Sequence, residues 1–121
     1  MTQTTPEQLI DTIVEALQDK KGHHIVIADL SDIESAPTQA FVLCTGGSPQ
    51  QVEALAGSVN DLVRDTLHEK AFHVAGLENR MWIAIDYGEV MVHIFLPEER
   101  DYYDLEHLWD DAKITELPDL D

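Results

Sequence analysis

The chain has 121 residues, and 44% of them are hydrophobic, so length and composition predict one folded soluble domain with a single core. Seven Lys and Arg residues face 24 Asp and Glu residues, and the formal net charge of −17 disfavours direct binding to nucleic acid or to an anionic membrane. The sequence has no membrane-spanning apolar run, no apolar secretory signal and one cysteine, Cys44, so we expect a protein of a reducing compartment without an internal disulfide.

The first predicted element is a helix that begins after Thr5. Thr5 is a suitable N-cap, Pro6 follows at the first helical position, and Gln8 completes a capping box. Apolar residues then recur at helical spacing, and we expect the helix to end near Asp19, before the C-terminal signal Lys20-Lys21-Gly22. The apolar stripe comprises Leu9, Ile10, Ile13, Val14 and Leu17.

Two buried strands and a second helix follow. Ile25–Leu30 and Ala40–Cys44 are short apolar runs that predict buried strands, and the polar segment Ser31–Gln39 between them predicts a loop. Ser48-Pro49-Gln50-Gln51 again supplies an N-cap, a proline at the first helical position and a glutamine at the third. This second helix is expected to last to about Glu69.

The second half of the chain predicts three more strands and a final helix. The strands are expected at Phe72–Val74, Met81–Asp86 and Glu89–Leu96. Leu105, Leu108 and Trp109 mark the final helix, and residues 114–121 predict an acidic, frayed tail beyond a domain of residues 1–113. This order of elements predicts a single α/β domain with a mixed five-stranded sheet covered by helices.

A glycine-rich turn, Gly46-Gly47-Ser48, lies between a predicted strand and a helix N-terminus, where backbone N–H groups can hold a phosphate. The turn is similar to the Gly-Gly-Ser turn of nucleotidyltransferases. Those enzymes require paired carboxylates on a following strand to hold Mg²⁺, whereas the next acids here lie on the polar side of a helix. We therefore favour a tight turn and a helix cap, and we predict no catalytic residues, no cofactor and no metal site.

The last two predicted strands form a hairpin across a Tyr87-Gly88 turn. The predicted opposed pairs are Asp86 with Glu89, Ala84 with Met91, and Trp82 with His93. The opposite face is uniformly aliphatic and predicts core, whereas this face carries a Trp, a Met and two turn acids, which favours docking of a basic partner. Two alternatives stay open: a helix covers this face and makes Trp82 a core residue, or solubility in a salty cytoplasm explains the charge.

Several short motifs together form a recognisable pattern. They are Trp82, Asp86-Tyr87-Gly88-Glu89-Val90, Val92-His93-Ile94-Phe95, Pro97-Glu98, Arg100, Tyr102-Tyr103, Leu105-Glu106 and Leu108-Trp109, with Ile25–Asp29, Phe41–Gly46, Ser48 and Gln51-Val52 upstream. The pattern resembles the Iojap family, the ribosomal silencing factors, over about Leu9 to Ala112. The chain departs from the family pattern at Pro37–Ala40 and at Ala75, which puts any role of those positions in doubt.

The resemblance implies a topology similar to nucleotidyltransferases without their catalytic acids. It also implies a bacterial cytoplasmic protein that binds the fourteenth protein of the large ribosomal subunit, blocks joining of the small subunit and represses translation when nutrients are scarce. From pattern and resemblance together, the residues expected to contact this partner are Trp82, Asp86, Tyr87, Glu89, Met91, His93, Tyr102 and Tyr103. The rival hypothesis is a nucleotidyltransferase-like enzyme that uses Gly46-Gly47-Ser48, and a homodimer through an uncovered sheet face or edge is left open.

Overall fold

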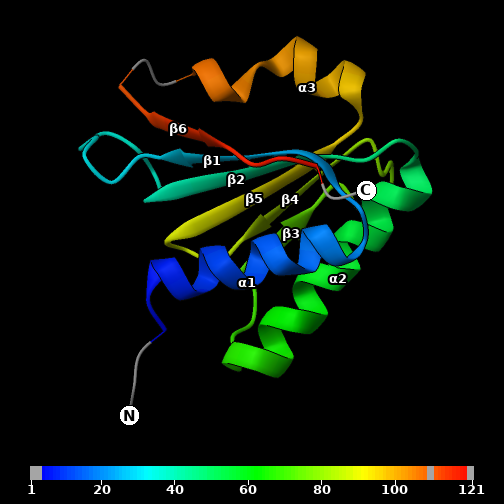
Figure 1. Cartoon of the computed structure of the whole chain (residues 1–121), viewed down its shortest axis with the longest axis horizontal. Helices are drawn as coiled ribbons and strands as arrows, with labels where there is room; N and C mark the ends of the chain where they lie inside the picture. The colour runs from blue at the N-terminus through cyan, green and yellow to red at the C-terminus, as the bar shows by residue number, and fades with distance from the viewer. Residues whose placement is uncertain (1–3, 109–110, 120–121) are drawn as a thin grey trace.

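The computed structural model of the chain describes residues 4–108 and 111–119 as a mixed sheet between two helical layers (Figure 1). Helices α1 (Pro6–Asp19) and α2 (Pro49–Leu67) pack on one face, and α3 (Pro97–Tyr103) and the 3-10 helix η1 (Leu105–His107) lie over the other. The single mixed α/β domain is thus confirmed, with six strands in the order β3-β4-β5-β2-β1-β6 where the sequence predicts five. The strands are β1 (His23–Asp29), β2 (Ala40–Thr45), β3 (His73–Ala75), β4 (Trp82–Asp86), β5 (Val90–Phe95) and β6 (Lys113–Glu116).

Both long helices begin at the caps that the sequence predicts. The Thr5 hydroxyl accepts a hydrogen bond from the Gln8 amide at 3.2 Å, and the Gln8 side-chain oxygen accepts one from the Thr5 amide at 2.8 Å. The Ser48 hydroxyl caps the first turn of α2 in the same way at 3.1 Å. α2 ends slightly earlier than predicted because His68 adopts a left-handed conformation with φ 57°. No helix within the described ranges is long and apolar enough to cross a membrane.

The centre of the sheet is the parallel pair β2 and β5, which runs from Ala40 opposite Val90 to Thr45 opposite Phe95. All six residues of β2 are buried, because helical elements cover both faces of the strand. On one face, the predicted apolar stripe of α1 and the apolar face of α2 form the larger core with the aliphatic side of the β4–β5 hairpin. Its buried members include Leu9, Ile13, Leu17, Val52, Leu55, Val59, Val63, Ile83, Ile85, Val92 and Ile94.

The β4–β5 hairpin turns one residue later than the sequence predicts. We expected a Tyr87-Gly88 turn with Asp86 opposite Glu89, but the turn residues are Gly88 and Glu89, and Asp86 lies opposite Met91. Gly88 has φ 85° and fits the first central position of a type II′ turn, where glycine is required. Each β4 residue therefore pairs with the β5 residue two positions beyond the predicted one. Because side chains alternate between faces with a period of two, every paired side chain stays on its predicted face. The corrected pairs are Trp82 with Phe95, Ala84 with His93, and Asp86 with Met91.

The C-terminal segment forms a strand where the sequence predicts a frayed tail over residues 114–121. Lys113–Glu116 pairs antiparallel with β1 as β6, and the Leu117 amide donates to the Ile25 carbonyl at 2.9 Å. The pairing occupies a sheet edge that β1 would otherwise leave open. All four side chains of β6 are exposed, so the segment lacks the alternating apolar pattern from which a strand is recognised in a sequence.

The predicted final helix is replaced by two shorter elements. Pro97, which directly follows the predicted strand Glu89–Leu96, occupies the first turn of α3, where a proline needs no N–H partner. α3 ends where Asp104 adopts a left-handed conformation with φ 49°. Leu105 then packs into the core beneath α3, Leu108 is 59% exposed, and Trp109 lies outside the described residues.

The substitution Thr115→Pro is expected to lower the free energy of unfolding by about 1 kcal/mol or more. Because the Leu117 amide points toward β1, antiparallel alternation directs the Thr115 amide toward Ile27, and proline cannot donate there. Glu116→Pro is the matched control, because the Glu116 amide points away from β1, where an edge strand tolerates proline. Urea unfolding would measure both variants, and an unchanged Thr115→Pro midpoint would mean that β6 is not paired in solution.

Candidate functional site

The partner-binding residues predicted from the sequence lie mainly on α3 and on the sheet face beneath it: Tyr102 and Tyr103 belong to α3, and Trp82, Asp86, Met91 and His93 lie on that face. This face has a second, smaller core, whose buried members are Val26, Ala28, Leu30, Phe41, Leu43 and Phe95. α3, η1 and the loop at residues 31–39 pack over this core. At the β4 side the cover is incomplete, because Trp82, Ala84 and Asp86 are only half-buried. Trp82 is therefore packed from beneath and still open to solvent, which is intermediate between the open docking face and the helix-covered core that the sequence allowed.

His93 lies directly beneath Trp82. The imidazole is 5% exposed, and its Nδ1 accepts a hydrogen bond from the indole Nε1–H of Trp82 at 3.1 Å. Its ring meets the edge of Phe41 at 4.9 Å between centroids, and Phe95 lies at 6.3 Å. Burial lowers the pKa of His93 to about 4, so the ring is neutral at neutral pH. His93 thus supports the surface from below and does not form part of it.

Three aromatic side chains lead from the sheet to the outer surface of α3. The ring of Tyr103 lies 4.5 Å from that of Trp82, and the ring of Tyr102 meets Tyr103 edge-on at 5.0 Å. Tyr103 is 49% exposed and Tyr102 is 81% exposed. We call Trp82, Tyr103 and Tyr102 the aromatic row. Because aromatic contacts of this kind are mutually stabilising, the row is one continuous feature and not three separate residues.

Arg100 anchors the helix that carries this row, a role that sequence reasoning did not assign. Its buried guanidinium donates through Nη1 to the His24 carbonyl at 2.5 Å and to the Thr45 hydroxyl at 2.8 Å. The same group lies 5.9 Å from the centroid of the Phe95 ring. A Pro-Glu-Glu-Arg helix start in an otherwise acidic segment was the available signal, since a single arginine among acids is a candidate anchor.

The remaining predicted residues are divided between the two faces of the sheet. Tyr87 is buried on the α2 side, and its hydroxyl donates to the Asn60 side-chain oxygen at 3.0 Å. Burial raises the pKa of Tyr87 to about 12. Met91 is half-buried on the Trp82 face, Glu89 is exposed, and the Asp86 carboxylate accepts from the Gly88 amide at 2.7 Å. The structure therefore brings Trp82, Met91, Tyr102 and Tyr103 to one face, together with the turn acids at its end.

The Gln51 side chain occupies a backbone N–H group of the Gly46-Gly47-Ser48 turn. The Gly47 amide donates to the Gln51 side-chain oxygen at 2.7 Å, and the Gly46 amide donates to the Phe95 carbonyl at 3.0 Å. These are the N–H groups that a phosphate would need. A Cβ atom on Gly46 would come within 2.8 Å of Val52, so close packing explains this glycine. Within residues 4–108 and 111–119, no three His, Cys, Asp or Glu side chains are grouped to hold a metal ion.

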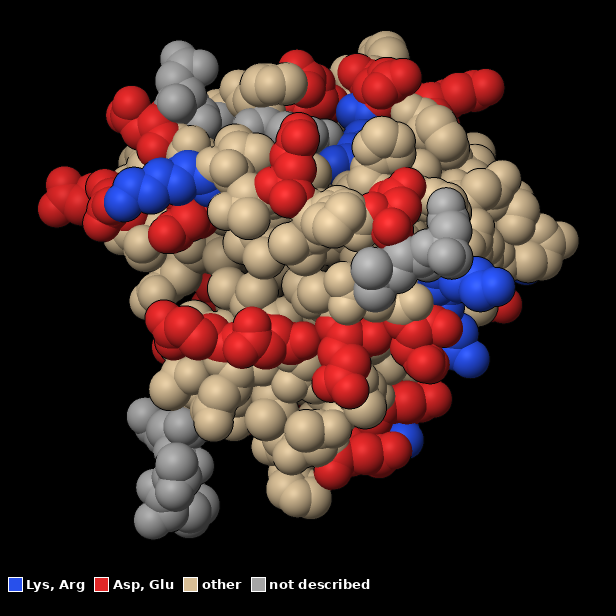
Figure 2. Space-filling model, viewed as in Figure 1, with Lys and Arg blue, Asp and Glu red and all other residues tan. Residues whose placement is uncertain are grey.

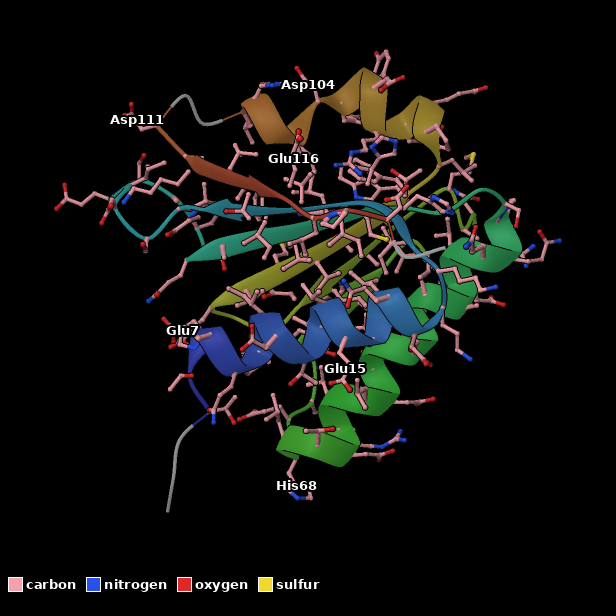
Figure 3. The ribbon with its side chains drawn as sticks, viewed as in Figure 1. Glu7, Glu15, His68, Asp104, Asp111 and Glu116 are labelled. Carbon is pink, nitrogen blue, oxygen red and sulfur yellow. The ribbon has the colours of Figure 1, made fainter. Side chains whose placement is uncertain are left out.

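Acidic side chains cover both helical layers. Figure 2 shows them in a row along α1, and Figure 3 shows Glu7 and Glu15 in this row, with Asp104, Asp111 and Glu116 on the side of α3 and β6. The exposed acids of α1 recur every four residues and comprise Glu7, Asp11, Glu15 and Asp19. Like charges at this spacing repel one another, so the row does not stabilise the helix. The charge therefore attracts basic partners to the whole molecule without selecting one pocket.

Comparisons with known proteins agree with this architecture. A family model described as "Ribosomal silencing factor during starvation" matches residues 2–121. A ribosomal silencing factor from Halalkalibacterium halodurans is 36% identical over 111 residues, which cover 92% of this chain and 93% of that protein. A crystal structure of a Chromobacterium violaceum protein is similar with a TM-score of 0.83 and 36% identity, and covers 91% of this chain and 90% of that one. A mouse protein named mitochondrial assembly of ribosomal large subunit protein 1 is 30% identical over 105 residues, which cover 83% of this chain and 44% of that protein.

The buried histidine predicts a loss of stability in mild acid. Unfolded His93 titrates near the ordinary pKa of 6.5, whereas burial lowers its pKa in the folded protein to about 4. Between these values the unfolded state binds the additional proton, so the contribution of neutral His93 is complete above pH 6.5 and is lost as the pH falls toward 4. The loss approaches roughly 3 kcal/mol.

Urea unfolding between pH 7 and pH 4 would measure this contribution, with His93→Asn as the variant that cannot titrate. The difference in unfolding free energy between wild type and variant should shrink as the pH falls, because only wild type is penalised by protonation. A difference that stays constant with pH would mean that His93 is not the group responsible.

Proposed function

The chain belongs to the family of ribosomal silencing factors, and we propose that it binds the large ribosomal subunit through that subunit's fourteenth protein. Bound at the subunit interface, it blocks joining of the small subunit by its bulk and so represses translation when nutrients are limiting. It acts in the bacterial cytoplasm. Its activity is a binding event and not a chemical reaction.

The aromatic row carries this proposal. Tyr and Trp side chains that are packed on one side and exposed on the other are the residues most enriched at the energetic centres of protein interfaces. Tyr102 is 81% exposed although it stands on a structured helix, and Trp82 and Tyr103 form a packed base beneath it. A seven-residue helix, anchored by a buried arginine, that presents two tyrosines to solvent is well suited to docking a protein.

The other predicted contact residues take different parts. Met91 extends the apolar surface of the Trp82 face toward the hairpin turn, and Asp86 and Glu89 place carboxylates at that end of the hairpin. Such acids act mainly on the rate of association with a basic protein and on its salt dependence. Tyr87 and His93 are buried, so we assign them to the support of the surface and not to contact with the partner.

The net charge of the chain and its similarity to a mouse protein both support a ribosomal partner. A formal net charge of −17 favours a basic protein surface and is repelled by the rRNA around it, which discourages misplaced binding. The mouse relative, whose name refers to assembly of the ribosomal large subunit, matches this chain over 105 residues. These observations favour the large subunit over the small subunit as the docking site.

The enzyme alternative receives no support from the glycine turn. The Gly47 amide is already bound to Gln51, and α2 places the acids that follow the turn on its outer surface. Cys44 is buried, and burial raises the pKa of its thiol to about 12, so it remains protonated and unreactive. We therefore assign no catalytic residue and no cofactor.

The direct test is sedimentation of the purified protein with separated ribosomal subunits. We expect it to migrate with large subunits and not with small subunits, and to reduce the amount of joined ribosomes when both are present. Migration with small subunits, or with neither, would contradict the proposed function. Large-subunit binding without any loss of joined ribosomes would contradict the steric mechanism alone.

Replacement of Tyr102 by alanine should weaken large-subunit binding by about 2 kcal/mol, or roughly 30-fold, because an exposed interface aromatic is lost. Its effect on stability should be small, since the side chain is 81% exposed. Phe72→Ala is a matched control, because Phe72 is 79% exposed but lies beside Leu9 and Gly88, away from α3. Equal binding by the two variants would exclude the aromatic row as the docking surface.

A further inference from the structure

We propose that His93 is a positioning residue of the docking surface: the imidazole fixes the indole of Trp82, and through it the whole aromatic row, in the orientation that binds the partner. This inference rests on the proposed function, since it assigns a role within the same surface. It concerns a buried residue that the partner cannot touch, because His93 is 5% exposed.

The hydrogen bond between the two rings defines the protonation of His93. The indole nitrogen of Trp82 can only donate, so at 3.1 Å the Nδ1 atom of His93 must accept. The proton of the neutral ring then resides on Nε2. An imidazolium has no acceptor nitrogen, so this contact requires the neutral form, which the buried site also favours.

The second ring nitrogen of His93, Nε2, indicates that packing alone does not account for a histidine at this position. Nε2 is buried and has no hydrogen-bond partner in the part of the chain that the structure describes. A buried donor without an acceptor is destabilising, and a phenylalanine among Phe41 and Phe95 would fill similar space without that defect. Among residues 4–108 and 111–119, the only polar partner of the ring is Trp82, so this hydrogen bond accounts for a histidine at this position.

The indole needs such a restraint because its surroundings are one-sided. Trp82 packs on Phe95 at 5.8 Å and on Tyr103 at 4.5 Å between centroids, but the residue is only half-buried at the β4 edge. Apolar ring contacts do not select one orientation of the indole within its plane. The bond from Nε1 to His93 does select one, because hydrogen bonds weaken steeply with misalignment.

The restraint extends to the tyrosines. α3 has only seven residues, too few for a helix that is stable by itself, so the place of its aromatic side chains depends on packing. Tyr103 packs on Trp82, and Tyr102 packs on Tyr103. An indole held by His93 therefore presents a row that is ordered before the partner arrives, which removes part of the entropy lost on binding.

Three substitutions separate this role from simple packing. His93→Phe keeps a ring but removes the acceptor. His93→Asn keeps an acceptor, because its side-chain oxygen is two bonds from Cβ, as Nδ1 is in histidine. Trp82→Phe removes the indole donor, so a double-mutant cycle with His93→Phe isolates the contribution that passes through the hydrogen bond.

Two measurements are made on each protein. The first is affinity for purified large ribosomal subunits, by titration of a fluorescently labelled chain at fixed salt. The second is a nitrogen-15 NMR spectrum that detects scalar coupling between the two nitrogens across the hydrogen bond, with the Trp82 indole signal assigned by its absence in Trp82→Phe.

Wild type should show the coupling, and His93→Phe should bind about tenfold more weakly, whereas His93→Asn should stay within about threefold of wild type. In the Trp82→Phe background, His93→Phe should cause no further loss. Affinity of His93→Phe equal to wild type, an equal loss in both backgrounds, or the absence of coupling in wild type would each overturn the inference. Coupling without any large-subunit binding by wild type would instead show that the proposed function has failed, and the positioning role with it.

Discussion

The parallel pairing of β2 with β5 is the interaction on which the rest of the structure depends, because it joins two antiparallel units, β6-β1-β2 and β3-β4-β5. Parallel strands cannot be connected by a tight turn, so α2 belongs to the crossover on one face, and α3 continues from β5 on the other. Both faces of the central strands are therefore buried, and polar groups there must find partners within the protein. Arg100 bonded to Thr45 and Trp82 bonded to His93 are such pairs, and both lie on the side of the sheet that α3 covers.

Local signals predicted much of the fold. Capping residues located the starts of α1 and α2, and alternation assigned the two faces of the β4–β5 hairpin, because a face depends on the parity of the register and not on its absolute value. The turn position was wrong because a glycine with positive φ, such as Gly88, suits either central position of a two-residue turn. Only the strand pairing, in which the Tyr87 amide donates to the Val90 carbonyl, decides between the two positions. β6 was not predicted because its pairing depends on backbone hydrogen bonds to β1. Its side chains are all exposed, so the sequence has no apolar alternation there.

The sequence predicted which residues make up the candidate site, but not how deeply each of them is buried. The pattern identified Trp82, Tyr102 and Tyr103, which the structure brings together, but alternation cannot show how far a helix from elsewhere covers a sheet face. For the same reason, Tyr87 and His93 could not be recognised as buried. The anchor Arg100 also required tertiary structure, since its acceptors belong to β1 and β2, far from it along the chain.

The central ladder also has a consequence for biosynthesis. It joins residues 40–45 to residues 90–95, and Phe41 packs against His93 under the aromatic row. Contacts between segments so distant in sequence can form only when both have left the exit tunnel, and the row itself is completed by α3. A partly synthesised chain therefore has no assembled aromatic row. Under the proposed function, a nascent silencing factor therefore cannot bind a free large subunit until almost all of the chain has emerged.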